Sequence, residues 1–130
     1  MKKLLIILTG LCLCAFSCDE TAETGMAAEK EALENLRTEI ETLIGTTACT
    51  EDSGCDVIAF GSKPCGGPWY YLAYSTAVDT EALLEMVATY NELEATYNEK
   101  WGVLSDCEVV TAPAGVICNI NGVCTIMGAD

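Results

Sequence analysis

The amino-acid sequence predicts an α+β domain, in which a small antiparallel sheet of about four strands packs with one or two helices and is stapled by disulfides. Three observations support this fold class: two segments with the apolar spacing of a helix, several short segments rich in β-branched and aromatic residues, and six cysteines spread over residues 49–124. The order helix, strand, strand, helix, strand, strand is typical of helices that cover one face of an antiparallel sheet. We expect a single domain over residues 26–130.

The first helix is predicted over residues 26–44, and Gly45 is a natural end for it. Its apolar residues recur at spacings of three and four, which places them on one helical face. This face either packs on the domain's own sheet or leaves the helix peripheral, as a surface for a partner. The face consists of Leu33, Leu36, Ile40, Leu43 and Ile44.

Two strands are predicted on either side of a loop. Residues 57–60 are apolar on both faces and short, which is typical of a buried strand. Residues 69–76 are rich in aromatic residues and form the second strand. Alternation along a strand places Tyr70, Leu72 and Tyr74 on one face, and Trp69, Tyr71 and Ala73 on the other.

The second helix is the clearest element of the sequence. Asp79 or Thr80 can cap its start, and Gly102 ends it. Its apolar stripe predicts a face packed in the core rather than the lining of a ligand pocket. The stripe consists of Leu83, Met86, Val87, Tyr90, Leu93, Tyr97 and Trp101.

The last part of the chain is predicted to form a third strand and a hairpin. The third strand lies within residues 103–110 and contains Cys107. The hairpin spans residues 116–126 around Asn121-Gly122, a dipeptide strongly favoured in two-residue turns.

The chain begins with a segment typical of an export signal. Lys2 and Lys3 precede an apolar run over residues 4–16, which is too short to cross a membrane and has the length of a signal-peptide core. The sequence Ala15-Phe16-Ser17-Cys18 follows. It resembles the lipobox of bacterial lipoproteins, in which cleavage precedes a cysteine that carries lipid. Ala15-Phe16-Ser17 also fits an ordinary signal cleavage site.

The number of cysteines favours lipid on Cys18. Of the nine cysteines, Cys12 and Cys14 lie within the predicted leader, residues 1–17. If Cys18 carries lipid, the remaining six can pair completely into disulfides. These six are Cys49, Cys55, Cys65, Cys107, Cys118 and Cys124.

The predicted anchor places the protein in a bacterial cell envelope, at the outer membrane or the cell surface. Residues 18–25 form an acidic tether, and its acidity resembles a signal that directs lipoproteins to the surface in some bacteria. The only membrane contact expected is the lipid, because a formal net charge of −14 disfavours adhesion to anionic lipid.

The pairing of the six cysteines is left open by the sequence, since fifteen pairings are possible. We favour Cys65 with Cys107, which would tie the loop between the first two strands to the third strand. Cys118 with Cys124 is possible across the hairpin, but each could equally reach Cys49 or Cys55.

Residues 61–71, here called the central loop, hold two prolines, three glycines, a cysteine and three aromatic residues. Proline fixes the backbone dihedral φ and glycine frees it, so this composition predicts a specified backbone path. We expect either a structural turn or a recognition surface in which Lys63 and Trp69 bind a partner. The competing expectation for Trp69 is that it caps the core beneath the first helix.

The run Lys63-Pro64-Cys65-Gly66-Gly67-Pro68-Trp69, the tyrosine-rich strand after it and the closing hairpin resemble a group of small secreted and lipid-anchored bacterial domains. The resemblance covers residues 49–124. It implies an exported, disulfide-bonded domain and implies no particular activity.

Several chemistries are disfavoured by composition. The chain has no histidine, which removes Ser-His and Cys-His catalysis and the commonest zinc ligand. The polar loop over residues 49–55 does not have the spacing of a calcium-binding EF-hand. With twenty acidic residues and six basic ones, nucleic acid is not an expected partner. We therefore expect no enzyme, no cofactor and no metal.

Two function classes remain. The first is a lipid-anchored interaction module that presents the central loop to a protein or a glycan. The alternative is an inhibitor of an extracellular hydrolase, because Lys63 lies beside a cysteine on a constrained loop, as in protease-inhibitor loops. The alternative requires an accessible, unpaired Lys63.

Overall fold

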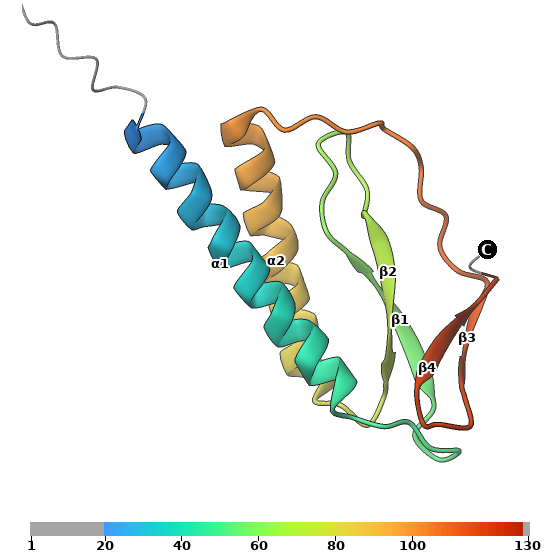
Figure 1. Ribbon diagram of the computed structural model, residues 1–130. Coiled ribbons are helices and arrows are strands. Elements are labelled where there is room, and N and C mark those ends of the chain that lie inside the picture. The colour runs from blue at the N-terminus through green and yellow to red at the C-terminus, as the bar shows by residue number, and fades with distance from the viewer. Residues whose placement is uncertain (1–19, 129–130) are drawn as a thin grey trace, which may run out of the picture.

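The computed structural model describes residues 20–128 of the 130-residue chain. Two antiparallel helices form one layer, a two-stranded sheet forms the middle layer, and a second two-stranded sheet forms the third (Figure 1). The α+β class and the disulfides are confirmed. The predicted leader and the lipidation residue Cys18 lie outside the described residues. The elements are α1 (Glu20–Gly45), β1 (Cys55–Phe60), β2 (Tyr70–Ser75), α2 (Thr80–Trp101), β3 (Gly115–Cys118) and β4 (Cys124–Met127).

The predicted four-stranded sheet is wrong in its pairing. Among residues 20–128, β1 pairs only with β2 and β3 pairs only with β4, each antiparallel. The β3–β4 pair packs across the face of the middle sheet, with β3 against β1 and β4 against β2. Both faces of β1 are therefore covered, which explains why its sequence is apolar on both faces.

Helix α1 packs along α2 and is part of the domain rather than peripheral to it. It begins at Glu20 rather than Met26, so residues 20–25 of the expected tether are helical. Leu33 and Ile40 of the predicted face are buried, at 8% and 0% exposure. Glu29 fastens the pair of helices, because its carboxylate accepts hydrogen bonds from Lys100 Nζ and, at 2.8 Å, from Trp101 Nε1.

Helix α2 has the predicted ends, and its predicted stripe is buried or half-buried except at Leu93, which is 49% exposed. The Asp79 side chain caps it by accepting a hydrogen bond from the Ala82 amide at 3.1 Å, and Gly102 ends it in the left-handed region at φ 62°. Tyr90 stacks on Phe60 with ring centroids 4.4 Å apart. The core between helices and sheet consists of Leu33, Ile40, Phe60, Tyr74, Val78, Leu83, Val87 and Tyr90.

The middle sheet presents its faces as predicted along β2, but the prediction is wrong for Trp69, which precedes the strand and lines a cleft on the helix side. Phe60 lies opposite Tyr70 in the register, and Ile58 lies opposite Leu72. The side chains of Tyr70, Leu72 and Tyr74 belong to the core on the helix side. Tyr71 therefore projects toward the other face, on the side of β3 and β4.

The predicted strand within residues 103–110 is wrong. Residues 103–114 contain no helix or strand and are here called the strap. Figure 1 shows the strap passing from the end of α2 over the central loop and then down to β3. A strand needs a neighbouring edge to pair with, and the strap runs past β2 without joining its ladder.

The predicted hairpin is confirmed. Cys118 lies opposite Cys124 at its closed end. Asn119 Oδ1 accepts hydrogen bonds from the amides of Asn121 at 2.9 Å and Val123 at 3.0 Å, and Gly122 adopts φ 72°. The side chain of Asn119 thus organises the turn together with the glycine.

All six cysteines predicted to pair do so. Cys65 is joined to Cys107, as favoured from the sequence. Cys118 and Cys124 do not pair with each other although they lie opposite in the register. They reach back instead, as Cys49–Cys118 and Cys55–Cys124, and join the third layer to the middle sheet and to the segment before it.

Candidate functional site

The backbone of the central loop follows a closed path. The Gly66 amide donates to the Lys63 carbonyl and the Lys63 amide donates to the Gly67 carbonyl, both at 2.8 Å. The Trp69 amide donates to the Phe60 carbonyl at 3.0 Å and closes the loop at its base. These bonds confirm the prediction of a specified backbone path.

Three polar residues of α2 hold the first residues of the loop. Asn91 Oδ1 accepts from the Gly61 amide at 2.7 Å, and Glu94 Oε2 accepts from the Ser62 amide at 2.5 Å. Asn98 Nδ2 donates to the Ser62 carbonyl at 2.6 Å. Sequence reasoning missed this role, although the three residues follow helical spacing beside the apolar stripe.

Lys63 is a clamp between the loop and the strap. Its side chain is buried, and Nζ donates to the Glu108 carbonyl at 2.8 Å and lies 3.5 Å from Asp106 Oδ1. The ammonium also lies 5.3 Å from the centroid of the Trp69 ring. The pKa of Asp106 is lowered, first by a hydrogen bond from the Glu108 amide and then by the charge of Lys63. The Cys65–Cys107 disulfide adds a covalent link at the same place.

This geometry corrects the expected role of Lys63. At 7% exposure, and with its ammonium paired internally, Lys63 has no free end to offer a partner. The hydrolase-inhibitor alternative required an accessible lysine, so the position of Lys63 no longer supports it.

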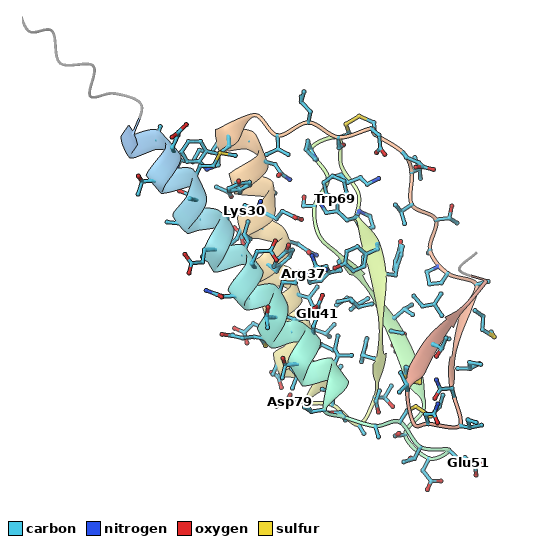
Figure 2. All side chains as sticks on the ribbon, in the orientation of Figure 1. Lys30, Arg37, Glu41, Glu51, Trp69 and Asp79 are labelled. Atoms are coloured by element: carbon cyan, nitrogen blue, oxygen red, sulfur yellow. A yellow bond between two sulfur atoms is a disulfide. The ribbon has the colours of Figure 1, made fainter. Side chains whose placement is uncertain are left out.

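Trp69 is half-buried and lines a cleft between the loop and the helices. Figure 2 shows Arg37 extending from α1 below Trp69, and the Arg37 guanidinium lies 5.9 Å from the Tyr70 ring. Burial raises the pKa of Tyr70, whose hydroxyl is buried without a hydrogen-bond partner among the described residues. The cleft holds about 220 Å³ and is lined by Glu34, Arg37, Phe60, Trp69, Tyr70, Tyr90 and Glu94.

A larger pocket lies where the strap passes β2. Its volume is about 490 Å³, within the range of roughly 300–1,000 Å³ typical of ligand sites. One wall is the lower strap, defined here as residues 109–114, and the Lys63 clamp and the Cys65–Cys107 disulfide hold the upper end of the strap. The pocket is lined by Tyr70, Tyr71, Val110, Thr111, Ala112, Pro113, Ala114, Ile126, Met127 and Gly128.

The backbone of the lower strap is unpaired. Within residues 20–128, no other residue makes a hydrogen bond to the backbone of residues 109–114. Val109 in this segment is 87% exposed. The strap therefore offers open main-chain donors and acceptors beside an apolar pocket.

The sulfurs of Cys49, Cys55 and Cys118 lie within 4.8 Å of one another. All three belong to disulfides, so none is a thiolate that could ligate a metal in this state. Their proximity reflects two adjacent disulfides that join the layers.

No helix of the described segment has both the length and the apolarity needed to cross a membrane. Comparison of the chain with protein-family models, with curated proteins and with solved structures found no match. The candidate site is therefore argued from its own geometry.

Proposed function

We propose that the chain is an exported bacterial cell-envelope protein, anchored through lipid on Cys18 at the outer membrane or cell surface. The observation that carries this proposal is the cysteine pairing. Every cysteine within residues 20–128 belongs to a disulfide, as expected of a domain that folds in an oxidising compartment. Cys18 follows a leader-like segment and has no partner left among those six, which supports a separate chemical role for it.

The folded domain is proposed to be a binding module and not an enzyme. The chain has no histidine, and the polar side chains gathered around the central loop bond to backbone groups within the domain. The feature suited to binding is the pocket beside Tyr71. Its wall is pre-organised by the Cys65–Cys107 disulfide, and pre-organisation lowers the ordering cost of binding.

A protein partner fits this pocket better than a glycan. Glycans present many hydroxyl groups and need a matching number of polar side chains, whereas the lining is mainly alanine, valine, proline, isoleucine and methionine. Hydroxyls on the lining side chains come only from two tyrosines and Thr111.

Lipidation is tested by labelling cells with an alkyne analogue of palmitate and recovering the full-length protein. We expect label on the wild type and on Cys14→Ser, and none on Cys18→Ser, which should be released from the membrane fraction. Equal labelling of the Cys18→Ser protein and the wild type, or an unlabelled wild type, would contradict the anchor.

A further inference from the structure

We infer that the pocket and the lower strap together dock an extended peptide segment of a partner protein, one with a large apolar side chain flanked by basic residues. This inference rests on the proposed binding function and names the partner's chemistry. Three properties of the site carry it: its unpaired main chain, its apolar pocket and the charge around the strap.

The main chain of residues 109–114 is the first property. Its amide and carbonyl groups have no partner among the described residues, and Pro113 alone lacks an amide. An extended segment lying alongside can exchange main-chain hydrogen bonds with such a backbone, as in β-strand addition. A helical segment cannot, because its own backbone groups are already paired within the helix.

The pocket is the second property. Alternate side chains of an extended segment point the same way, so one of them enters the pocket beside Tyr71. The volume of about 490 Å³ accommodates a large aromatic or aliphatic side chain. The exposed Val109 and the half-exposed Met127 continue the apolar surface at the rim.

Charge is the third property. Asp106 and Glu108 are exposed on the strap, and the buried Lys63 beneath it lies 3.5 Å from Asp106 and offsets that charge. The carboxylate of Glu108 has no cationic partner among the described residues and remains as a negative charge on the strap. The described residues that line the pocket carry no charged side chain of either sign, so the charge lies outside the pocket, on the strap. A formal net charge of −14 for the chain reinforces the negative potential there. Basic residues on either side of the apolar anchor therefore complement the site.

The inference is tested with a displayed library of random eight-residue peptides, selected against the purified, disulfide-bonded domain. We expect enrichment of peptides with one large apolar residue and adjacent Lys or Arg. The Ala114→Phe variant fills the pocket from an exposed position and should weaken the selected peptide about tenfold or more. Ala28→Phe, on an exposed part of α1, is the matched control and should bind like the wild type.

The peptide itself provides two further checks. Methylation of a backbone nitrogen removes its N–H donor. If main-chain bonds are made, methylation of alternate nitrogens in the peptide should weaken binding about tenfold, which corresponds to about 1.4 kcal/mol. Binding should also weaken as salt is raised, because exposed charges are screened. Insensitivity to both treatments would overturn the strand-like mode.

Other outcomes separate this inference from the proposed function. Absence of any enriched peptide, or equal binding of the peptide to Ala114→Phe and Ala28→Phe, would overturn the peptide site. Palmitate label on Cys18 would still support the envelope proposal in that case. The domain is also applied to a glycan array. Binding to a glycan that is abolished by Ala114→Phe would overturn the peptide inference but support the proposal that the domain is a binding module. If Cys18 is not labelled but the pocket binds the selected peptide, only the proposal of a lipid anchor is overturned.

Discussion

Lys63 Nζ donates a hydrogen bond to the carbonyl oxygen of Glu108 at 2.8 Å, across 45 positions of the chain. The Cys65–Cys107 disulfide makes a second link between the same two segments. The central loop therefore fixes the upper end of the strap, and the lower strap forms a wall of the pocket. Of the two expectations for this loop, a structural turn or a recognition surface, these links support the structural one.

Replacing Lys63 with methionine should weaken the domain through this link. The variant keeps the packing over Trp69 but leaves the Glu108 carbonyl without its charged donor. We expect the free energy of unfolding to fall by about 1–3 kcal/mol, measured by urea denaturation. Lys30→Met removes an exposed lysine and should change stability by less than about 0.5 kcal/mol. Equal stability of the two variants would show that the clamp contributes nothing.

The close approach of Gly61 to Trp69 gives a second prediction. A Cβ at Gly61 would lie 2.5 Å from Trp69 Cδ1, and the residue has φ 82°. Gly61→Ala therefore combines a clash with backbone strain, and we expect a loss of about 3 kcal/mol or more. Gly67 has φ 83° with nothing within 4 Å of a Cβ, so Gly67→Ala isolates the strain at about 1–2 kcal/mol. Equal losses in thermal unfolding would exclude the clash.

Elements with local signals were predictable from the sequence. Helix α2 shows its stripe, its capping Asp79 and its terminal Gly102 within one short segment. The hairpin likewise carries its own turn residues. Helix α1 was placed with the correct face but too late a start, because residues 20–25 contain no large apolar residue to mark the helical period.

Apart from the favoured Cys65–Cys107 pairing, features that depend on distant partners were not predictable. Residues 103–110 have strand-like composition, but the disulfide and the Lys63 clamp hold them away from any ladder. The pairing of Cys49 with Cys118 and Cys55 with Cys124 stacks the hairpin on the sheet face, and fifteen pairings were open. A lysine on a polar loop suggests exposure, whereas its burial follows from acceptors contributed by the strap.

The polar contacts of α2 provide a third prediction. Asn98 is 6% exposed and is the donor to the Ser62 carbonyl at 2.6 Å. Asn98→Ala leaves that carbonyl unsatisfied, at a cost of about 1–2 kcal/mol, which the better helix propensity of alanine offsets by about 0.5 kcal/mol. We expect a net loss near 1 kcal/mol in chemical denaturation. The neighbouring Glu99 is exposed, so Glu99→Ala should be neutral or slightly stabilising. An equal loss of stability in the two variants would show that the Asn98 hydrogen bond does not stabilise the loop.

Alkaline pH should destabilise the domain through its buried tyrosines. Burial first, and then the charge of Glu94, raises the pKa of Tyr90 above its ordinary value of 10.0. The neutral form is therefore favoured in the folded state, and this stabilisation is present below about pH 10 and is lost as the pH rises further. Tyr70 and Tyr74 are shifted in the same direction, mainly by burial.

Stability measured between pH 9 and pH 11.5 should thus decline with pH, and Tyr90→Phe should show a shallower decline. The ring contact with Phe60 is kept in this variant, so its stability at pH 7 should fall by no more than about 1 kcal/mol. If stability declines as steeply in the variant as in the wild type, groups other than Tyr90 cause the alkaline sensitivity.

Trp69 is the remaining residue predicted to bind a partner, and its position distinguishes two roles. The indole is half-buried, packs against Gly61 and lies under the Lys63 ammonium, so it supports the clamp. Truncating a fully buried aromatic costs roughly 3–5 kcal/mol. For a half-buried one we expect about 2 kcal/mol for Trp69→Ala in urea denaturation.

Binding separates the two roles more sharply. Trp69 does not line the pocket beside Tyr71, so Trp69→Ala should retain the affinity of the selected peptide at temperatures where the variant is folded. Trp101→Ala, which removes the other half-buried tryptophan and its bond to Glu29, serves as the control for general destabilisation. If Trp69→Ala instead keeps its stability within about 0.5 kcal/mol and loses partner capture, then Trp69 is a contact residue, and the recognition surface lies at the central loop rather than at the strap.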